Sequence, residues 1–255
     1  MHLALPAREK NQPYLGWIIV SILELAEKTG HADPSAFALS LLGPLLLEAG
    51  GMPEQAVSLA DRALQLARER NATAVISRVL YIRAMFVSHH RGHVAATLEE
   101  FQEGLVLARQ SGDLYFLGRN AHGRALSGLC NLSLRLGRVR SLMEESEVSV
   151  HRAGEADLKE SFDLSWQFYF NLVGVSRNKS RLSGDRFLEE NSLNLWEERQ
   201  FHQGLYLAYY YKTILALLFQ EWEDARDFAL KAQNFEHSVH GTSFLPAHRF
   251  RLALA

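Results

Sequence analysis

The chain has 255 residues, 47% of them hydrophobic and 22% charged, which is enough to bury a large core, and its formal net charge is −2. With 27 basic and 29 acidic residues, the chain has no excess of positive charge that would indicate binding to nucleic acid or to an anionic membrane. A single cysteine, Cys130, excludes an intramolecular disulfide framework and any multi-cysteine metal site, and it suits a reducing compartment.

Apolar residues recur at helical spacing along nearly the whole chain, and no convincing strand alternation interrupts them. Short breaks of Gly, Asn, Asp and Pro separate the predicted helices, which in chain order cover residues 15–29, 34–49, 53–70, 73–89, 94–111, 113–136, 139–153, 158–176, 184–196, 201–219, 223–239 and 244–255. No apolar stretch approaches the roughly 20 residues that cross a bilayer. The N-terminus carries no signal pattern, so we expect a cytoplasmic, all-α protein whose residues 1–13 are flexible.

Small residues recur on one face of several helices. They are Ala56, Ala60 and Ala63, then Ala225, Ala229 and Ala232, with a weaker copy in Thr97, Phe101 and Gly104. Small side chains at spacings of three and four let a second helix approach closely. Steps of about 42 residues lead from Ala63 through Gly104, Glu147 and Glu190 to Ala232. This period predicts a single tetratricopeptide-like solenoid of five to six helical hairpins over residues 1–255.

Motifs for catalysis are missing from the sequence. There is no Walker A or GxGxxG loop and no kinase signature, so we predict no phosphoryl transfer. His89 and His93 have the spacing of two metal ligands, but Gly92 lies at a turn between them and no third ligand follows. Cys130 lies in an apolar run, where core packing explains it. We therefore expect no enzyme activity in this chain, no catalytic or metal-binding residue and no cofactor.

Two aromatic clusters are candidates for partner binding. One is Trp166, Tyr169 and Phe170, and the other is Tyr206, Tyr209 and Tyr210. Both fall on the first helices of successive predicted hairpins, which line the concave surface of such solenoids. Tyrosine offers a large contact area and a hydroxyl group, which favours peptide recognition. Packing between neighbouring repeats is the alternative and explains the clusters more simply.

A third pattern is a series of basic residues near the predicted turns inside hairpins, namely Arg91, Arg135, Arg138, Arg140, Arg177, Lys179 and Arg181. If the hairpins stack, these residues would form one basic edge that could dock an acidic partner segment or domain. The alternative is that they are cations at helix C-termini and in turns that must be polar. No base-reading residues accompany them, so nucleic acid is not expected.

Several stretches resemble the tetratricopeptide-like helical segment of large bacterial signalling kinases. They are FALSLLGPLLLEAGG with AVSLADRALQLARER; FVSHHRGHVAATLEEFQEGLVLARQSGDLYFLGRNAH; WQFYFNLVG with RLSGDRF; and LAYYYKTILALLFQEWEDARDFALKAQNFEHSVHGTSFLPAHRFRLALA. In that family a serine/threonine kinase domain and a STAND-type ATPase precede the segment, and GAF and histidine kinase domains follow it.

The resemblance implies a non-catalytic scaffold that relays signals between sensor, ATPase and kinase domains by binding protein domains or peptides. The final stretch AHRFRLALA would be a helix cut off after barely two turns, so we also expect this chain to be a piece of a longer protein. The alternative is a small-molecule sensor, like the helical-repeat region of MalT-type regulators.

Overall fold

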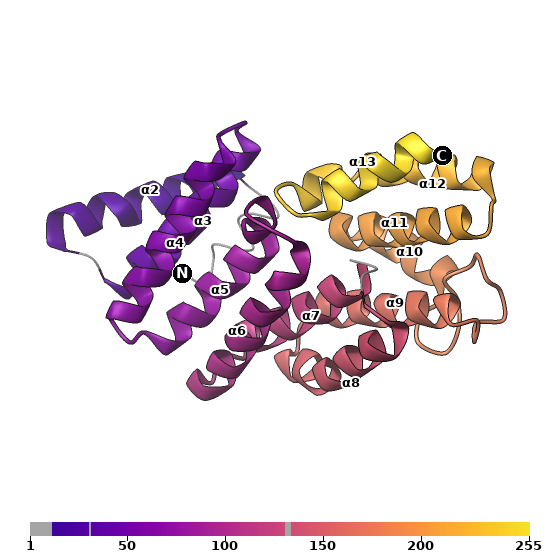
Figure 1. Ribbon diagram of the computed structural model, residues 1–255, viewed down its shortest axis with the longest axis horizontal. Coiled ribbons are helices and arrows are strands. Elements are labelled where there is room, and N and C mark those ends of the chain that lie inside the picture. Colours follow the sequence, from indigo (N-terminus) through magenta and orange to yellow (C-terminus); the bar gives the residue numbers. More distant parts are fainter. Residues whose placement is uncertain (1–11, 31, 131–133) are drawn as a thin grey trace. The chain divides into compact units, whose positions relative to one another are not determined.

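The computed structural model describes residues 12–30, 32–130 and 134–255. These residues form twelve α-helices and three short 3-10 helices, and their only β-type pairing is an isolated bridge between Ser183 and Leu188 (Figure 1). The all-α prediction is therefore confirmed. No helix in this part of the chain combines the length and apolar character that a bilayer crossing requires. The predicted flexibility of residues 1–13 falls almost entirely outside the described residues.

The chain divides into two compact units, Met1–Ser127 and Gly128–Ala255. The boundary lies within the last turn of helix α7 (Leu114–Cys130) rather than in a linker. Boundaries between compact units are recognised in a sequence by Gly- or Ser-rich linkers. This boundary lies inside a helix, so no such linker marks it.

The N-terminal unit is a series of antiparallel helices joined by short turns. They are α2 (Gln12–Thr29), α3 (Asp33–Glu48), α4 (Pro53–Glu69), α5 (Thr73–Phe86), α6 (Thr97–Ser111) and most of α7, with 3-10 helices over Ser88–His90 and Val94–Ala96. Helix α3 packs against α4 and α5 against α6, while α3 also contacts α5. Gly112 ends α6 in the left-handed conformation (φ 72°), which glycine adopts without strain.

The predicted faces of small residues are the contact surfaces of these pairs. Ala56, Ala60 and Ala63 of α4 are at most 1% exposed. A Cβ atom built on Gly43 of α3 would lie 3.2 Å from the carbonyl oxygen of Ala56, so the two backbones approach closely. Gly104 of α6 makes a similarly close approach to Asn120 of α7.

The C-terminal unit surrounds helix α11 (His202–Leu218). The other helices are α8 (Leu136–Ala153), α9 (Ala156–Leu172), α10 (Glu189–Glu198), α12 (Trp222–Gln233) and α13 (Phe244–Leu254), with a 3-10 helix over Glu236–Val239. Helix α11 contacts α9, α10, α12 and α13. Ala225, Ala229 and Ala232 of α12 are fully buried, as their spacing predicts. The ring of Tyr211 stacks on that of Phe168 of α9, with 4.1 Å between centroids.

Several predicted boundaries were wrong, most clearly around α10. The helix expected over residues 158–176 ends at Leu172, and the one expected from Gly184 begins only at Glu189. Residues 173–188 instead form a loop that side chains of α9 hold through hydrogen bonds. The helices expected over residues 73–89, 94–111 and 223–239 each include a 3-10 segment. The helix predicted for residues 113–136 ends at Cys130, and residues 131–133 lie outside the description.

The 42-residue spacing places Glu147 and Glu190 on α8 and α10, but neither occupies a position of close helix packing. Glu147 pairs with Arg186, and the Glu190 side chain is 79% exposed. The 42-residue period therefore predicts correctly that helices lie at these two positions. It does not predict helix packing there, because neither position has the small-residue contact that is found in α4 and α12.

Candidate functional site

The six aromatic residues predicted to contact a partner lie on α9 and α11. Four of them, Trp166, Tyr169, Tyr206 and Tyr210, are between 0% and 6% exposed, and Phe170 and Tyr209 are partly exposed. The ring of Trp166 packs edge-on against that of Tyr169, and Tyr206 stacks on Tyr210, each with 5.8 Å between centroids. The four buried rings offer a partner almost no accessible area. Of the six candidates, only Phe170 and Tyr209 have side-chain area that a partner could contact.

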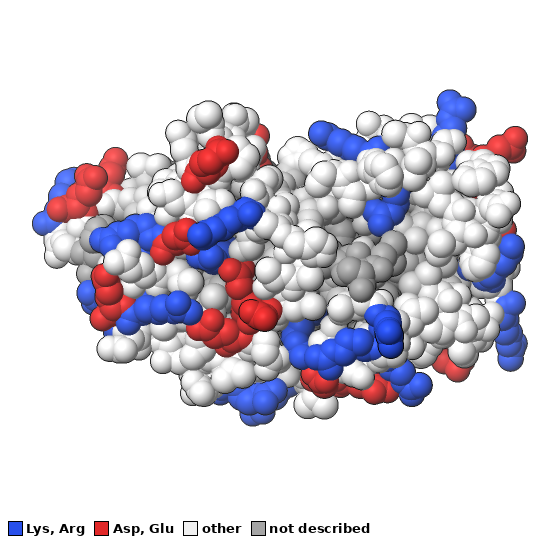
Figure 2. Space-filling view, in the orientation of Figure 1, with Lys and Arg blue, Asp and Glu red and all other residues white. Residues whose placement is uncertain are grey.

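Arg91, the first residue of the predicted basic edge, belongs to the N-terminal unit. Its guanidinium lies 3.0 Å from the Asp61 carboxylate, which also pairs with Arg83. On the face seen in Figure 2, basic and acidic side chains alternate over α4 to α6. Asp61 thus pairs with two arginines, and Arg83 also pairs with Glu100, so charges of both signs lie next to Arg91.

The other six basic residues belong to the C-terminal unit. Arg135 is the N-cap of α8, and Arg138 and Arg140 lie within this helix, so their placement in a turn was wrong. Arg138 and Arg140 lie 3.5 and 2.8 Å from Glu145 and Glu144. Arg177, Lys179 and Arg181 lie in the loop after α9, as predicted.

Helix α9 holds this loop through two buried amide side chains. The Asn171 side-chain amide donates to the backbone carbonyls of Asn178, Lys179 and Arg181 at 3.1, 3.0 and 2.8 Å. Gln167 donates to the Asn171 side-chain oxygen at 2.9 Å. Within the loop, the Asn178 carboxamide oxygen accepts from the backbone N–H groups of Ser180 and Arg181. These contacts fix the backbone from which the loop side chains project.

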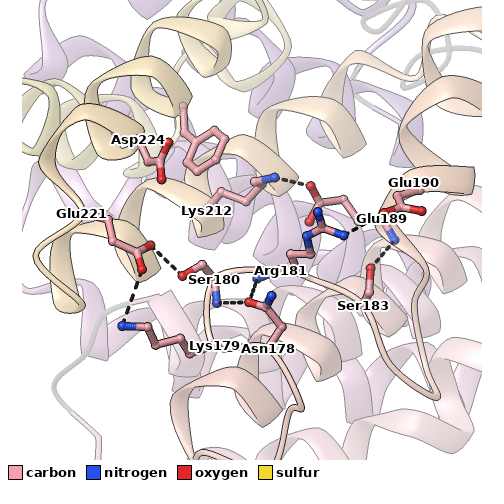
Figure 3. Close-up of a pocket in the computed structure, with 11 residues that line it drawn as sticks. Asn178, Lys179, Ser180, Arg181, Ser183, Glu189, Glu190, Lys212, Glu221 and Asp224 are labelled. Carbon is pink, nitrogen blue, oxygen red and sulfur yellow. Dashed lines mark hydrogen bonds and ion pairs between the residues drawn. The ribbon is translucent and has the colours of Figure 1, made fainter.

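A cavity of about 630 Å³ lies between this loop and helices α11 and α12 (Figure 3). Apart from Phe228, the residues that line it are polar or charged, and they come from the loop, the first turn of α10, the middle of α11 and the first turns of α12. The lining residues are Asn178, Lys179, Ser180, Arg181, Ser183, Glu189, Glu190, Lys212, Glu221, Asp224 and Phe228.

A buried ion pair connects two walls of this cavity. The Lys212 ammonium pairs with Glu189 Oε1, and the two side chains are 10% and 12% exposed. The second Glu189 oxygen accepts from the backbone N–H of Leu182 at 2.9 Å. The Lys212 ammonium also lies 4.3 Å from the centre of the Phe228 ring, a favourable cation–π distance. The cost of removing both charges from water offsets much of the attraction in a buried ion pair, so such a pair adds little net stability. We therefore interpret the Lys212–Glu189 pair as a contact that positions α10 against α11.

The loop cations at the cavity are also paired. Lys179 lies 3.5 Å from Glu221, and Arg181 lies 2.9 Å from Glu190. The Ser180 hydroxyl donates to the other Glu221 oxygen at 2.6 Å. An acidic partner segment would therefore have to displace carboxylates of the chain itself, which weakens the hypothesis of a basic docking edge at this point.

Most of this site could not be predicted from the sequence, and only Lys179 and Arg181 among the lining residues were candidates. Lys212 carried a usable signal, because it is the only charged residue in the run LYLAYYYKTILALLF. A lysine in a helix that is otherwise apolar is rarely buried without a partner. The partner, Glu189, follows an irregular loop and had no signal of its own.

The histidines considered as metal ligands do not share one helix face, because His89 lies in the 3-10 helix Ser88–His90 and His93 is the N-cap of the 3-10 helix Val94–Ala96. His89 and His90 lie in a 3-10 helix with ring centroids 4.2 Å apart, and burial, assisted by the charge of His90, lowers the pKa of His89 to about 4. Across residues 12–30, 32–130 and 134–255, no three or more His, Cys, Asp or Glu side chains converge as metal ligands would. Burial raises the pKa of the Cys130 thiol to about 12, which opposes a role as a nucleophile.

Comparisons with known proteins found no matching family model, no similar curated protein and no similar solved structure. The resemblance to the helical segment of signalling kinases therefore stays a prediction.

Proposed function

We propose that this chain is a non-catalytic interaction scaffold of tetratricopeptide-like hairpins. In keeping with the resemblance, it would relay signals between the sensor, ATPase and kinase domains of a bacterial signalling protein. The observation that carries the proposal is the order of helix contacts in the N-terminal unit. Helix α3 pairs with α4 and α5 with α6, and the first helices of these two pairs, α3 and α5, also contact each other. Stacked hairpins would have this neighbour order, and their exposed helix faces bind partners without covalent chemistry.

Selection of random peptides displayed on phage against the folded chain tests this proposal. We expect enrichment of related peptides whose binding slows hydrogen exchange in a defined set of helices. Urea-unfolded chain is the control, because a scaffold surface exists only in the folded state. Absence of enrichment, or equal retention by the unfolded chain, would contradict the proposal.

A small-molecule sensor is a second candidate, and the 630 Å³ cavity favours it. A metabolite that binds only the folded state raises the melting temperature by mass action. A screen of metabolites by thermal shift separates the two functions. A sensor predicts a concentration-dependent rise with one compound class, whereas a peptide scaffold predicts no such rise.

A further inference from the structure

The cavity of the C-terminal unit carries one charge that its own side chains do not neutralise. Four carboxylates line it, from Glu189, Glu190, Glu221 and Asp224, and three cations, from Lys179, Arg181 and Lys212. Each cation is paired with one of the first three carboxylates. Asp224 is exposed to solvent at the mouth of the cavity. No ion pair or hydrogen bond joins its carboxylate to another described residue, and no dashed line reaches it in Figure 3.

The surroundings of Asp224 suit a positively charged group with an alkyl chain. Phe228 follows four residues later on α12, so the two side chains lie on the same face of the helix, and both line the cavity. The aromatic ring forms an apolar wall for methylene groups, while the carboxylate of Asp224 offers both oxygens to N–H donors. The nearby Lys212 ammonium repels a second cation only weakly, because Glu189 neutralises it.

The walls of the cavity are also ordered before any ligand arrives. The Asn171 amide fixes three carbonyls of the loop, and the Lys212–Glu189 pair fixes α10 against α11. A ligand therefore loses little free energy to ordering the protein.

We propose that this cavity binds an ammonium or guanidinium group, with Asp224 as its counter-ion and Phe228 as the wall along its alkyl chain. The inference rests on the proposed binding role of this chain and specifies its chemistry. The group could belong to a lysine or arginine side chain of a peptide or to a free polyamine. An acidic ligand would find each cation of the cavity already occupied.

Isothermal titration calorimetry of the whole chain tests the inference with defined probes. They are a lysine pentapeptide with blocked ends, its Nε-acetylated form, the matching glutamate pentapeptide and spermidine. We expect the lysine peptide, spermidine or both to bind, and the acetylated and glutamate peptides not to bind. Binding to the lysine peptide alone would identify a peptide ligand, and binding to spermidine alone would identify a free amine.

Asp224→Asn should weaken binding of the cationic probe about tenfold, which corresponds to the loss of one charge-assisted contact. The matched control is Glu223→Gln, because Glu223 is an exposed acid in the same helical turn that does not line the cavity. Equal weakening by both variants would reduce the effect to general charge attraction and overturn the inference. Binding of the glutamate peptide, or of none of the probes, would also overturn it.

The two proposals fail separately. If phage display enriches peptides without basic residues, and these bind the Asp224→Asn variant normally, the scaffold function stands and the cation site is wrong. If no peptide is enriched but spermidine binds in an Asp224-dependent manner, the scaffold function is wrong and the cation site stands.

Discussion

The contact between α6 and α7 leaves no room for a side chain at Gly104. A Cβ atom added there would lie 2.8 Å from Cγ of Asn120 and even closer to its side-chain oxygen. Asn120 is fully buried, and its amide donates to the Phe116 carbonyl at 2.8 Å and to the Ser77 hydroxyl at 3.3 Å. Gly104→Ala must therefore displace the Asn120 side chain or move the helices apart.

The expected magnitude follows from three contributions. Alanine in place of glycine stabilises a helix interior by about 1 kcal/mol. Overpacking in a close contact costs roughly 1–3 kcal/mol, and each hydrogen bond lost by Asn120 costs roughly another 1 kcal/mol. The net effect is a destabilisation of about 2 kcal/mol. Urea unfolding followed by far-ultraviolet circular dichroism measures it as a lower midpoint.

Two further variants isolate the cause. In an Asn120→Ala background the obstructing side chain is gone, so Gly104→Ala should there be neutral or slightly stabilising. Gly16 lies in α2 with no atom within 4 Å of an added Cβ, so Gly16→Ala should stabilise the chain by up to about 1 kcal/mol. If Gly104→Ala stabilised the chain as Gly16→Ala does, the helices would not approach closely at Gly104 and the reasoning would be refuted.

Three other predictions concern buried polar groups. Lys212→Met leaves the Glu189 carboxylate buried without its cation, and we expect a loss of about 3–5 kcal/mol in urea unfolding; most of it should return in the double variant with Glu189→Gln. Cys130, with its raised pKa of about 12, should not react with a disulfide reagent at pH 8 until the chain is unfolded, and rapid reaction of the folded chain would contradict its burial. Burial, assisted by the charge of Arg119, lowers the pKa of His122 from 6.5 to about 3. Below pH 6.5 the unfolded chain therefore binds a proton at His122 that the folded chain does not bind, so the free energy of unfolding should fall by about 2 kcal/mol from pH 7 to pH 5. The variant His122→Gln should lack this part of the pH dependence of the free energy of unfolding.

The helices and their pairing could be predicted because both depend on local spacing. Alanines three and four residues apart, such as Ala56, Ala60 and Ala63, can only lie on one face of a helix, and a face without large side chains admits a second helix. The shape of residues 173–188 could not be predicted in this way. It depends on the side chain of Asn171, which binds three backbone carbonyls of residues further along the chain. Nothing in the sequence distinguishes that asparagine from one that faces solvent.

The basic residues near the turns show why charge is harder to predict than packing. The position of Arg181 beside a turn could be predicted, but its effect on a partner depends on whether a carboxylate lies within reach. That carboxylate, from Glu190, is brought to it by the fold of the loop rather than by a fixed spacing. A lysine isolated in an apolar helix is a stronger signal. Burying a charge without a partner is unfavourable, so Lys212 requires a carboxylate from another helix or loop. Where charged side chains from several elements meet in this way, the cavity between them is lined by polar groups. Such an isolated charge in an otherwise apolar helix therefore locates a candidate binding site better than a series of exposed charges does.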